Sequence, residues 1–205
     1  MADPLIAELR RRAGDALLAT DEAKDLGRTG AAPLDDRSIE RAEAILGRPL
    51  PALLREIYLL VGNGGFGPGF GLLPLVANPG ESEPESVVGL FTAFCSQDPA
   101  DPAWSWPSNL LPFCDWGCAI RSCVDCDSPD AAVVTFDPNV LGVGEPLSRG
   151  LVRSHTSLRS WLSDWIAGVK LWDLMFEPDP DQATAIVNPF TSDPIRVVPN
   201  RLKQR

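Results

Sequence analysis

The residues from Leu46 to Leu75, LGRPLPALLREIYLLVGNGGFGPGFGLLPL, constrain the fold more than any other part of this sequence. Pro51 suits the first turn of a helix, because its missing N–H would have no partner there and its φ is already helical. Gly62 ends that helix, and the Asn-Gly-Gly of residues 63–65 tolerates positive φ, so the chain can reverse sharply. The stretch therefore predicts a helix, a tight corner and then a strand over residues 70–76.

Three glycines of this corner, Gly62, Gly64 and Gly67, match the GxGxxG pattern of dinucleotide-binding loops. Such a site needs a strand before the glycines and a helix N-terminus after them to meet the pyrophosphate. Here a helix precedes the glycines, and Pro68 with the following glycines prevents a helix afterwards. We interpret the corner as structural.

The size and composition indicate one globular unit that needs neither metal nor disulfides to build its core. The chain has 205 residues, of which 44% are hydrophobic and 22% charged. No apolar run reaches membrane-spanning length, and residues 1–14 lack the pattern of a secretion signal. We expect a cytoplasmic protein that does not bind membranes, is a monomer or weak dimer, and has no cofactor.

The negative charge lies in the middle of the chain. The net charge is −10, and residues 61–148 contain one basic residue, Arg121, against 11 acidic ones. Such a region repels nucleic-acid phosphates and attracts basic partners.

Caps and apolar periodicity predict helices in the first third of the chain. A leading helix starts at Asp3 and Pro4, with Ala16 and Leu17 still on its apolar side. A second helix is capped by Asp35 or Asp36, buries Ile39, Ala42, Ile45 and Leu46, and ends at Gly47. The third begins at Pro51. Residues 21–33 are polar and contain glycine, so they form a linker.

The rest of the chain predicts short strands and two more helices. The strands cover residues 70–76, 111–113, 118–124 and 131–136, and a short helix lies within residues 85–95. A last helix, with Thr156 as its cap, carries Trp161 and Trp165 on one apolar stripe over residues 156–169. Residues 185–187 and 195–198 form a small hairpin in a proline-rich tail. These boundaries divide the chain into residues 1–34, 35–170 and 171–205.

Four cysteines fall within thirteen residues and are the sharpest chemical candidate. The last pair has the CxxC spacing of zinc sites, but a second close pair is lacking, so we interpret them as buried or partly exposed thiols rather than metal ligands. They are Cys114, Cys118, Cys123 and Cys126.

Other candidates for catalysis are weak. Asp125, Asp127 and Asp130 follow a strand and could hold Mg²⁺, yet a solvated acidic turn is the simpler interpretation. His155 is the single histidine, and no nucleophile turn accompanies it, so we place it at the surface or beside a helix cap. Trp104, with the neighbouring tryptophans, suits a core or a protein interface.

Two separated motifs resemble the SUKH superfamily, which includes the Smi/Knr-type yeast cell-wall regulators. The first motif runs from the Leu-Gly at residue 46 through the Asn-Gly-Gly corner to LLPL, and the second is WPSNLLPFCDWGC, residues 106–118. The resemblance covers about residues 35–170. The motif residues that it assigns to building the fold are Leu46, Gly47, Pro51, Asn63, Gly64, Gly65, Trp116 and Gly117.

The resemblance implies an α+β fold, with helices packed on a mostly antiparallel β-sheet, and a protein without enzymatic activity. Bacterial members are similar to immunity proteins, which bind and neutralise toxin domains, often nucleases. A basic toxin domain is then the expected partner, met by an acidic face to which Trp104 adds an aromatic anchor. That face is formed by Glu81, Glu83, Glu85, Asp98, Asp101, Asp125, Asp127 and Asp130.

Two other classes remain open from the sequence. The same fold permits a regulatory scaffold that recruits cellular proteins. An enzyme or zinc protein centred on residues 114–130 is the third possibility.

Overall fold

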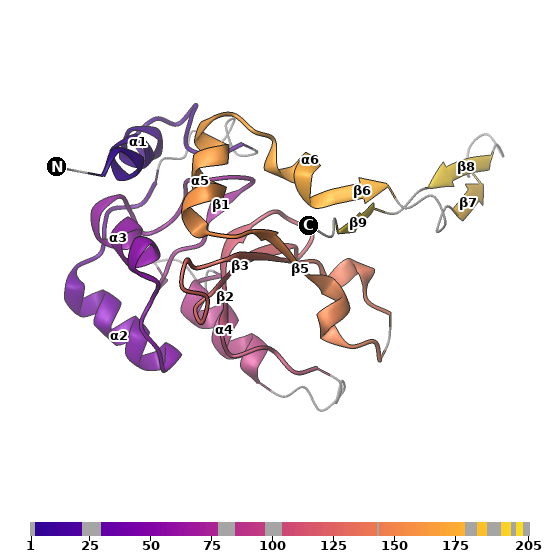
Figure 1. Ribbon diagram of the computed structural model, residues 1–205, viewed down its shortest axis with the longest axis horizontal. Coiled ribbons are helices and arrows are strands. Elements are labelled where there is room, and N and C mark those ends of the chain that lie inside the picture. Colours follow the sequence, from indigo (N-terminus) through magenta and orange to yellow (C-terminus); the bar gives the residue numbers. More distant parts are fainter. Residues whose placement is uncertain are drawn as a thin grey trace.

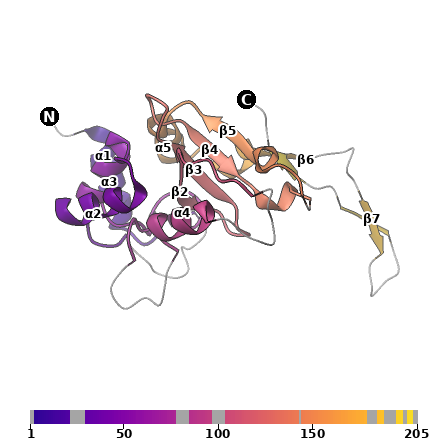
Figure 2. The same ribbon diagram turned by 90° about the horizontal axis from the view of Figure 1, so that it is seen from below.

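Helices pack around a five-stranded antiparallel sheet (Figure 1). The computed structural model describes residues 3–21, 30–77, 85–96, 104–142, 144–178, 184–187, 194–197 and 200–202. Within them, three N-terminal helices form a group beside the sheet (Figure 2), and the expected α+β class is confirmed.

The leading helix α1, Pro4–Ala13, starts as expected, because the Asp3 side chain accepts a hydrogen bond of 2.9 Å from the Leu5 N–H. The helix ends earlier than predicted. Ala16 and Leu17 therefore lie in a turn beyond it, and Leu17 is exposed.

Helix α2, Asp36–Leu46, is capped by Asp35 and ended by Gly47 at φ 69°. The prediction that Ile45 faces the core was wrong, because Ile45 is 63% exposed. Helix α3, Ala52–Leu60, has Pro51 as its N-cap residue, one position before the predicted first turn.

The sheet has the order β1-β2-β3-β4-β5, and each neighbouring pair is antiparallel. Its strands are β1 Gly71–Leu72, β2 Leu110–Asp115, β3 Arg121–Asp125, β4 Val133–Phe136 and β5 Leu151–His155. The register pairs Leu110 with Asp125 and Val124 with Val133, so β2, β3 and β4 form a meander.

Three predicted strands were too long, and one observed strand was not predicted. The strand predicted over residues 131–136 begins only at Val133. The predicted strand over residues 70–76 is only two residues long, because the glycine corner takes its first part and a bend takes its last. The third predicted strand loses residues 118–120, since Cys118 and Ala119 adopt positive φ in a turn. The edge strand β5 was not predicted at all.

The later helices follow their caps. Helix α4, Val87–Cys95, begins at Ser86, and α5, Leu158–Ile166, begins at Ser157 rather than at the predicted Thr156. Both serine side chains accept a hydrogen bond from the N–H three residues on. Short 3₁₀ turns cover Pro138–Val140 and Leu147–Gly150, and helix α6 covers Leu171–Met175.

The expected hairpin in the tail is present. Strand β7, Thr184–Val187, pairs with β8, Pro194–Val197, and β6, Phe176–Pro178, pairs with β9, Asn200–Leu202.

The helices and the sheet share one hydrophobic core. Helix α1 contributes Leu5, Ile6 and Leu9 to it and packs against α3 and α5. The leading helix is thus part of the same core as the elements that follow the linker.

Candidate functional site

The glycine corner, residues 62–71, and the Asp-Trp-Gly turn, residues 115–117, lie against each other. The Phe70 N–H donates to the Asp115 carbonyl over 3.0 Å, and Gly71 pairs with Asp115 in the β1–β2 ladder. A Cβ added at Gly69 would come within 2.7 Å of the Trp116 ring. The glycine corner and the Asp-Trp-Gly turn, which are about 45 residues apart in the sequence, therefore form one structural unit.

Within the corner, the residues have different roles. Gly64 and Gly65 adopt φ values of 80° and 79°, as the sequence indicated, but Asn63 is not among the residues with positive φ. Its buried side chain instead accepts a hydrogen bond of 2.8 Å from the Leu75 N–H and donates one of 2.9 Å to the Val76 carbonyl. Asn63 thus closes the loop that follows the corner.

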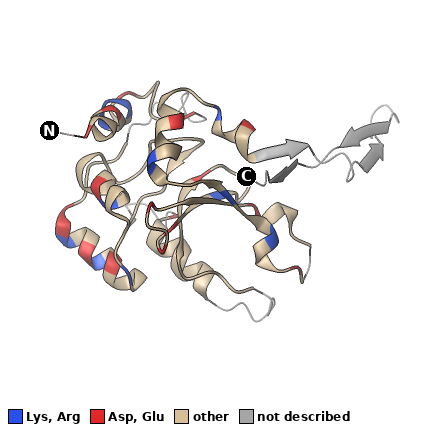
Figure 3. Cartoon of the chain, in the orientation of Figure 1, with Lys and Arg blue, Asp and Glu red and all other residues tan. Residues whose placement is uncertain are grey.

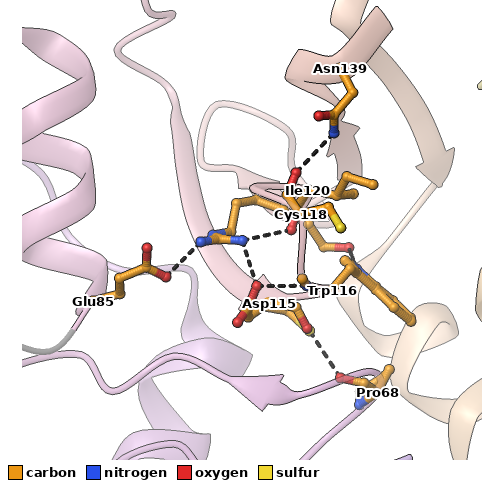
Figure 4. A network of polar contacts seen from close by, with 11 residues as sticks. Pro68, Glu85, Asp115, Trp116, Cys118, Ile120 and Asn139 are labelled. Atoms are coloured by element: carbon orange, nitrogen blue, oxygen red, sulfur yellow. Dashed lines mark hydrogen bonds and ion pairs between the residues drawn. The ribbon is translucent and has the colours of Figure 1, made fainter. Parts of the chain in front are cut away.

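Arg121 is the only basic residue of the acidic middle of the chain, and it is buried. Its guanidinium donates to the Asp115 carboxylate, and its Nη2 donates to Glu85 over 2.6 Å (Figure 4). Glu85, predicted to face a partner, is therefore tied to the core, although its side chain remains half exposed. The described part of residues 61–148 therefore has no exposed basic side chain.

The described residues contain no group of three or more His, Cys, Asp or Glu side chains that could hold a metal ion, and all four clustered cysteines are described. Cys114 and Cys123 are buried, Cys118 is exposed and Cys126 is half-buried. Burial raises the pKa of the Cys114 and Cys123 thiols, and it raises the pKa of Cys126 to about 11.

The three aspartates of the turn between β3 and β4 do not converge as metal ligands would. Asp125 accepts hydrogen bonds from Asn109 Nδ2 at 2.8 Å and from the Asp127 N–H at 3.1 Å, so it shapes the turn. Asp127 is 72% exposed and lies 3.2 Å from Arg48 Nη1. The Asp130 side chain is exposed, while its backbone carbonyl accepts from the Leu158 N–H.

This turn forms one wall of an open groove of about 680 Å³, called here the turn groove. The starts of α3 and α5 form the other walls, and Ala52, Leu53 and Pro129 supply apolar surface. Its charged lining consists of three carboxylates, Glu56, Asp127 and Asp130, and one guanidinium, Arg159. Arg159 is paired with Asp3 at 2.6 Å and Asp127 with Arg48 at 3.2 Å, so Glu56 and Asp130 are the groove's charged side chains without an ion pair among the described residues.

The sequence did not point to Glu56, Arg48 or Arg159. Glu56 lies one turn along an apolar helix, and Arg159 stands on the exposed side of α5. Glu56 and Arg159 come close to the turn between β3 and β4 because α3 packs beside α5.

Trp104 belongs to an aromatic cluster rather than standing alone. Its ring stacks on Trp106 at 6.1 Å and meets the edge of Phe94 at 5.7 Å, and its Nε1 donates to the Phe94 carbonyl. It is half-buried. Trp104 therefore contributes to packing between α4 and the sheet as well as to the surface.

Four predicted partner residues, Glu81, Glu83, Asp98 and Asp101, lie outside the described residues. His155, which we placed at the surface or beside a helix cap, lies two residues before Ser157, the cap of α5. Its side chain is only 7% exposed, and its Nε2 lies 3.3 Å from the Asp164 carboxylate. That pair holds a strand edge to a helix.

Comparison with known families gives one match, over residues 33–164, to the model described as SMI1 / KNR4 family (SUKH-1). It spans both the glycine corner and the Asp-Trp-Gly turn. A search of curated proteins gives no match. In the described part of the chain, no helix is both long and apolar enough to span a membrane.

Proposed function

Because the chain belongs to the SMI1 / KNR4 family (SUKH-1), we propose that it is a non-enzymatic protein-binding domain, an immunity protein that neutralises a cognate bacterial toxin. The partner is a basic toxin domain, and the acidic face of the immunity protein binds it.

The turn groove carries this proposal. It combines apolar surface from Ala52, Leu53 and Pro129 with exposed carboxylates at Asp127 and Asp130. Protein interfaces need both kinds of surface, since apolar contacts hold the complex and complementary charges raise the association rate. A toxin that acts on nucleic acid presents cations to phosphates, and the same cations suit this groove.

The charge distribution supports the same partner. The cation of the central region, Arg121, is bound to Asp115 and Glu85 inside the protein. The described residues of the central region, 61–148, therefore present carboxylates and no exposed arginine or lysine to a basic partner.

The proposal also includes a location. The described cysteines are all free thiols, which persist in a reducing compartment, so the cytoplasm suits the protein.

The test is co-purification of the chain with the product of the adjacent gene, followed by an assay for blocked toxicity in cells. The variant Asp130→Lys reverses a carboxylate of the groove that makes no described side-chain ion pair, and we expect it to weaken binding at least about tenfold. Glu40→Lys changes the net charge equally on α2, where both signs of charge alternate (Figure 3), and it should leave binding unchanged.

Equal weakening by Asp130→Lys and Glu40→Lys would mean that only net charge matters and that the groove is not the contact. Failure of the wild-type chain to capture or neutralise the adjacent gene product would remove the immunity assignment. Capture of a cellular regulator in its place would favour the scaffold class.

A further inference from the structure

Two aromatic side chains remain exposed where the glycine corner meets the Asp-Trp-Gly turn. Phe70 is 47% exposed and lies beside Gly117, and Trp172 is 39% exposed and lies beside Trp116. The Trp172 ring lies 6.0 Å from the Trp116 ring, and a Cβ on Gly117 would come within 2.9 Å of the Phe70 ring. We call Phe70, Trp116, Gly117 and Trp172 the aromatic cap.

The cap rests on the core through a line of rings. Trp116 meets Trp161 edge-on at 6.5 Å, and Trp161 meets Phe113 at 5.1 Å. The Trp116 indole N–H also donates to Ser122 Oγ over 2.9 Å. Trp172 is therefore the exposed end of an aromatic series whose inner members are buried and held in place.

Phe70 is also held in position by its backbone. It stands in a turn in which the Gly71 N–H donates to the Pro68 carbonyl, and its own N–H donates to Asp115. Gly69 and Gly71 on either side adopt positive φ. Exposed rings that are already positioned lose little conformational entropy on binding, which is a property of interface hot spots.

Carboxylates surround the cap. Asp21 accepts a hydrogen bond from the Gly69 N–H, Asp115 accepts one from the Gly117 N–H, and the exposed Asp173 follows Trp172 directly. Asp115 is already paired with the buried Arg121, so Asp21 and Asp173 supply the negative charge beside the cap, and the exposed Lys170 opposes them. Aromatic faces beside carboxylates attract guanidinium groups, because the ring quadrupole and the carboxylate both favour a cation.

From this arrangement we propose that the aromatic cap is a binding site for an arginine side chain on the surface of a basic protein partner. The site is separate from the turn groove, and as part of a toxin interface it rests on the proposed function. A second copy of this chain fits less well, since two chains of net charge −10 repel each other. An anionic membrane would be repelled for the same reason.

The test uses the peptide acetyl-Gly-Arg-Gly-amide and a matched peptide with neutral citrulline in place of arginine, each titrated into the full chain. Two-dimensional NMR follows the tryptophan indole N–H signals. We expect saturable shifts of the Trp172 signal with the arginine peptide, at least about fivefold weaker binding of the citrulline peptide, and weakening by added salt.

Variants locate the site. Trp172→Leu should abolish saturable binding, Trp172→Phe should retain part of it, and Asp173→Lys should weaken it severalfold without touching the core. The control is Ile45→Ala, which removes an even more exposed apolar side chain on α2 and should have no effect. Retention of the native unfolding transition in each variant shows that the fold is intact.

Equal binding of the two peptides, saturable binding that survives Trp172→Leu, or no saturation at all would overturn the inference. So would a Trp172 signal that shifts with protein concentration alone, since that identifies a second copy as the occupant. The peptide result is independent of the toxin assay. A chain that binds arginine but does not neutralise the adjacent gene product would lose the proposed function and keep this site.

Discussion

At the scale of single residues, the glycine corner shows two separate reasons for glycine. Gly64 has φ 80° and is also enclosed, because a Cβ there would lie 2.6 Å from the Leu72 carbonyl oxygen and from the Pro74 nitrogen. Gly168 has φ 82°, but a Cβ there would meet nothing within 4 Å. Both atoms that crowd Gly64 belong to the backbone, so they cannot move as a side-chain end could.

These two glycines make a matched pair of substitutions. Gly168→Ala should cost about 1–2 kcal/mol, which is the backbone strain of a left-handed alanine. Gly64→Ala adds the steric clash and should cost more than about 4 kcal/mol or yield insoluble protein. Urea unfolding measures both, and similar costs at the two positions would show that the corner is less crowded than described.

Asn63 gives a second prediction at this scale. Asn63→Ala removes both hydrogen bonds to the loop and leaves the buried Leu75 N–H without its acceptor, so we expect a loss of about 2–4 kcal/mol. Ser163→Ala on the exposed side of α5 should change the free energy of unfolding by less than about 0.5 kcal/mol. A cost for Asn63→Ala as small as that of the serine variant would exclude the loop-closing role.

The thiols give a third prediction. Only the thiolate form of cysteine reacts with a disulfide reagent. The pKa of Cys126 is raised to about 11, so at pH 8 only about one Cys126 side chain in a thousand is a thiolate. Raising the pH toward 11 should therefore speed its labelling. The exposed Cys95 and Cys118 should react first, and Cys114 and Cys123 only on unfolding. A fast phase that survives in the double variant with Cys95→Ser and Cys118→Ser would contradict this order.

At the scale of elements, the local patterns predicted most helices because caps and apolar spacing are local. Asp3, Asp35 and Gly47 lie at the helix ends where the sequence placed them. Adjacent Thr156 and Ser157 are equivalent as caps in the sequence, and only the three-dimensional path of the chain selects Ser157.

Strands were predicted less well because their pairing is not local. β5 reads LVRSH, without the apolar alternation of a strand, and it forms because β4 offers it an edge. The acidic turn was predictable from its composition, whereas the turn groove depends on α3 and α5 packing beside it. Asn63 was assigned to the corner, but its hydrogen bonds to residues 75 and 76 require the folded loop.

Helix α1 provides the prediction for this scale. Arg12 Nη2 donates to the last-turn carbonyl of Ile166 in α5 over 2.7 Å, and its guanidinium lies 4.8 Å from the Trp165 ring. Arg12→Ala should cost about 2 kcal/mol, because it removes a charged donor from a helix end and a cation–π contact. Arg11 pairs with Glu8 at the surface, and Arg11→Ala should cost less than about 0.5 kcal/mol.

The melting temperatures of the two arginine variants show whether α1 stabilises the core or is only loosely attached to it. Equal melting temperatures would place α1 in the second class. The buried Leu5 and Leu9 argue for the first, and α1 would then belong to the folding unit even though the family match begins at residue 33.

At the scale of the whole molecule, the uneven charge affects how fast a partner arrives. The central region has a balance of −10, while the rest of the chain is neutral overall, so a basic partner is attracted toward one part of the surface. The association rate with a captured basic protein partner should fall by roughly tenfold or more between about 0.05 and about 0.5 M salt. The dissociation rate should change little, because buried apolar contacts determine it.

Stopped-flow kinetics of the wild type and Asp130→Lys tests this separation. The variant should show a shallower dependence of the association rate on salt, since one carboxylate that attracts the partner has become a cation. Glu40→Lys should keep the wild-type slope, because its charge lies on the mixed surface of α2. If salt instead changed mainly the dissociation rate, the carboxylates would hold the bound complex rather than guide its formation.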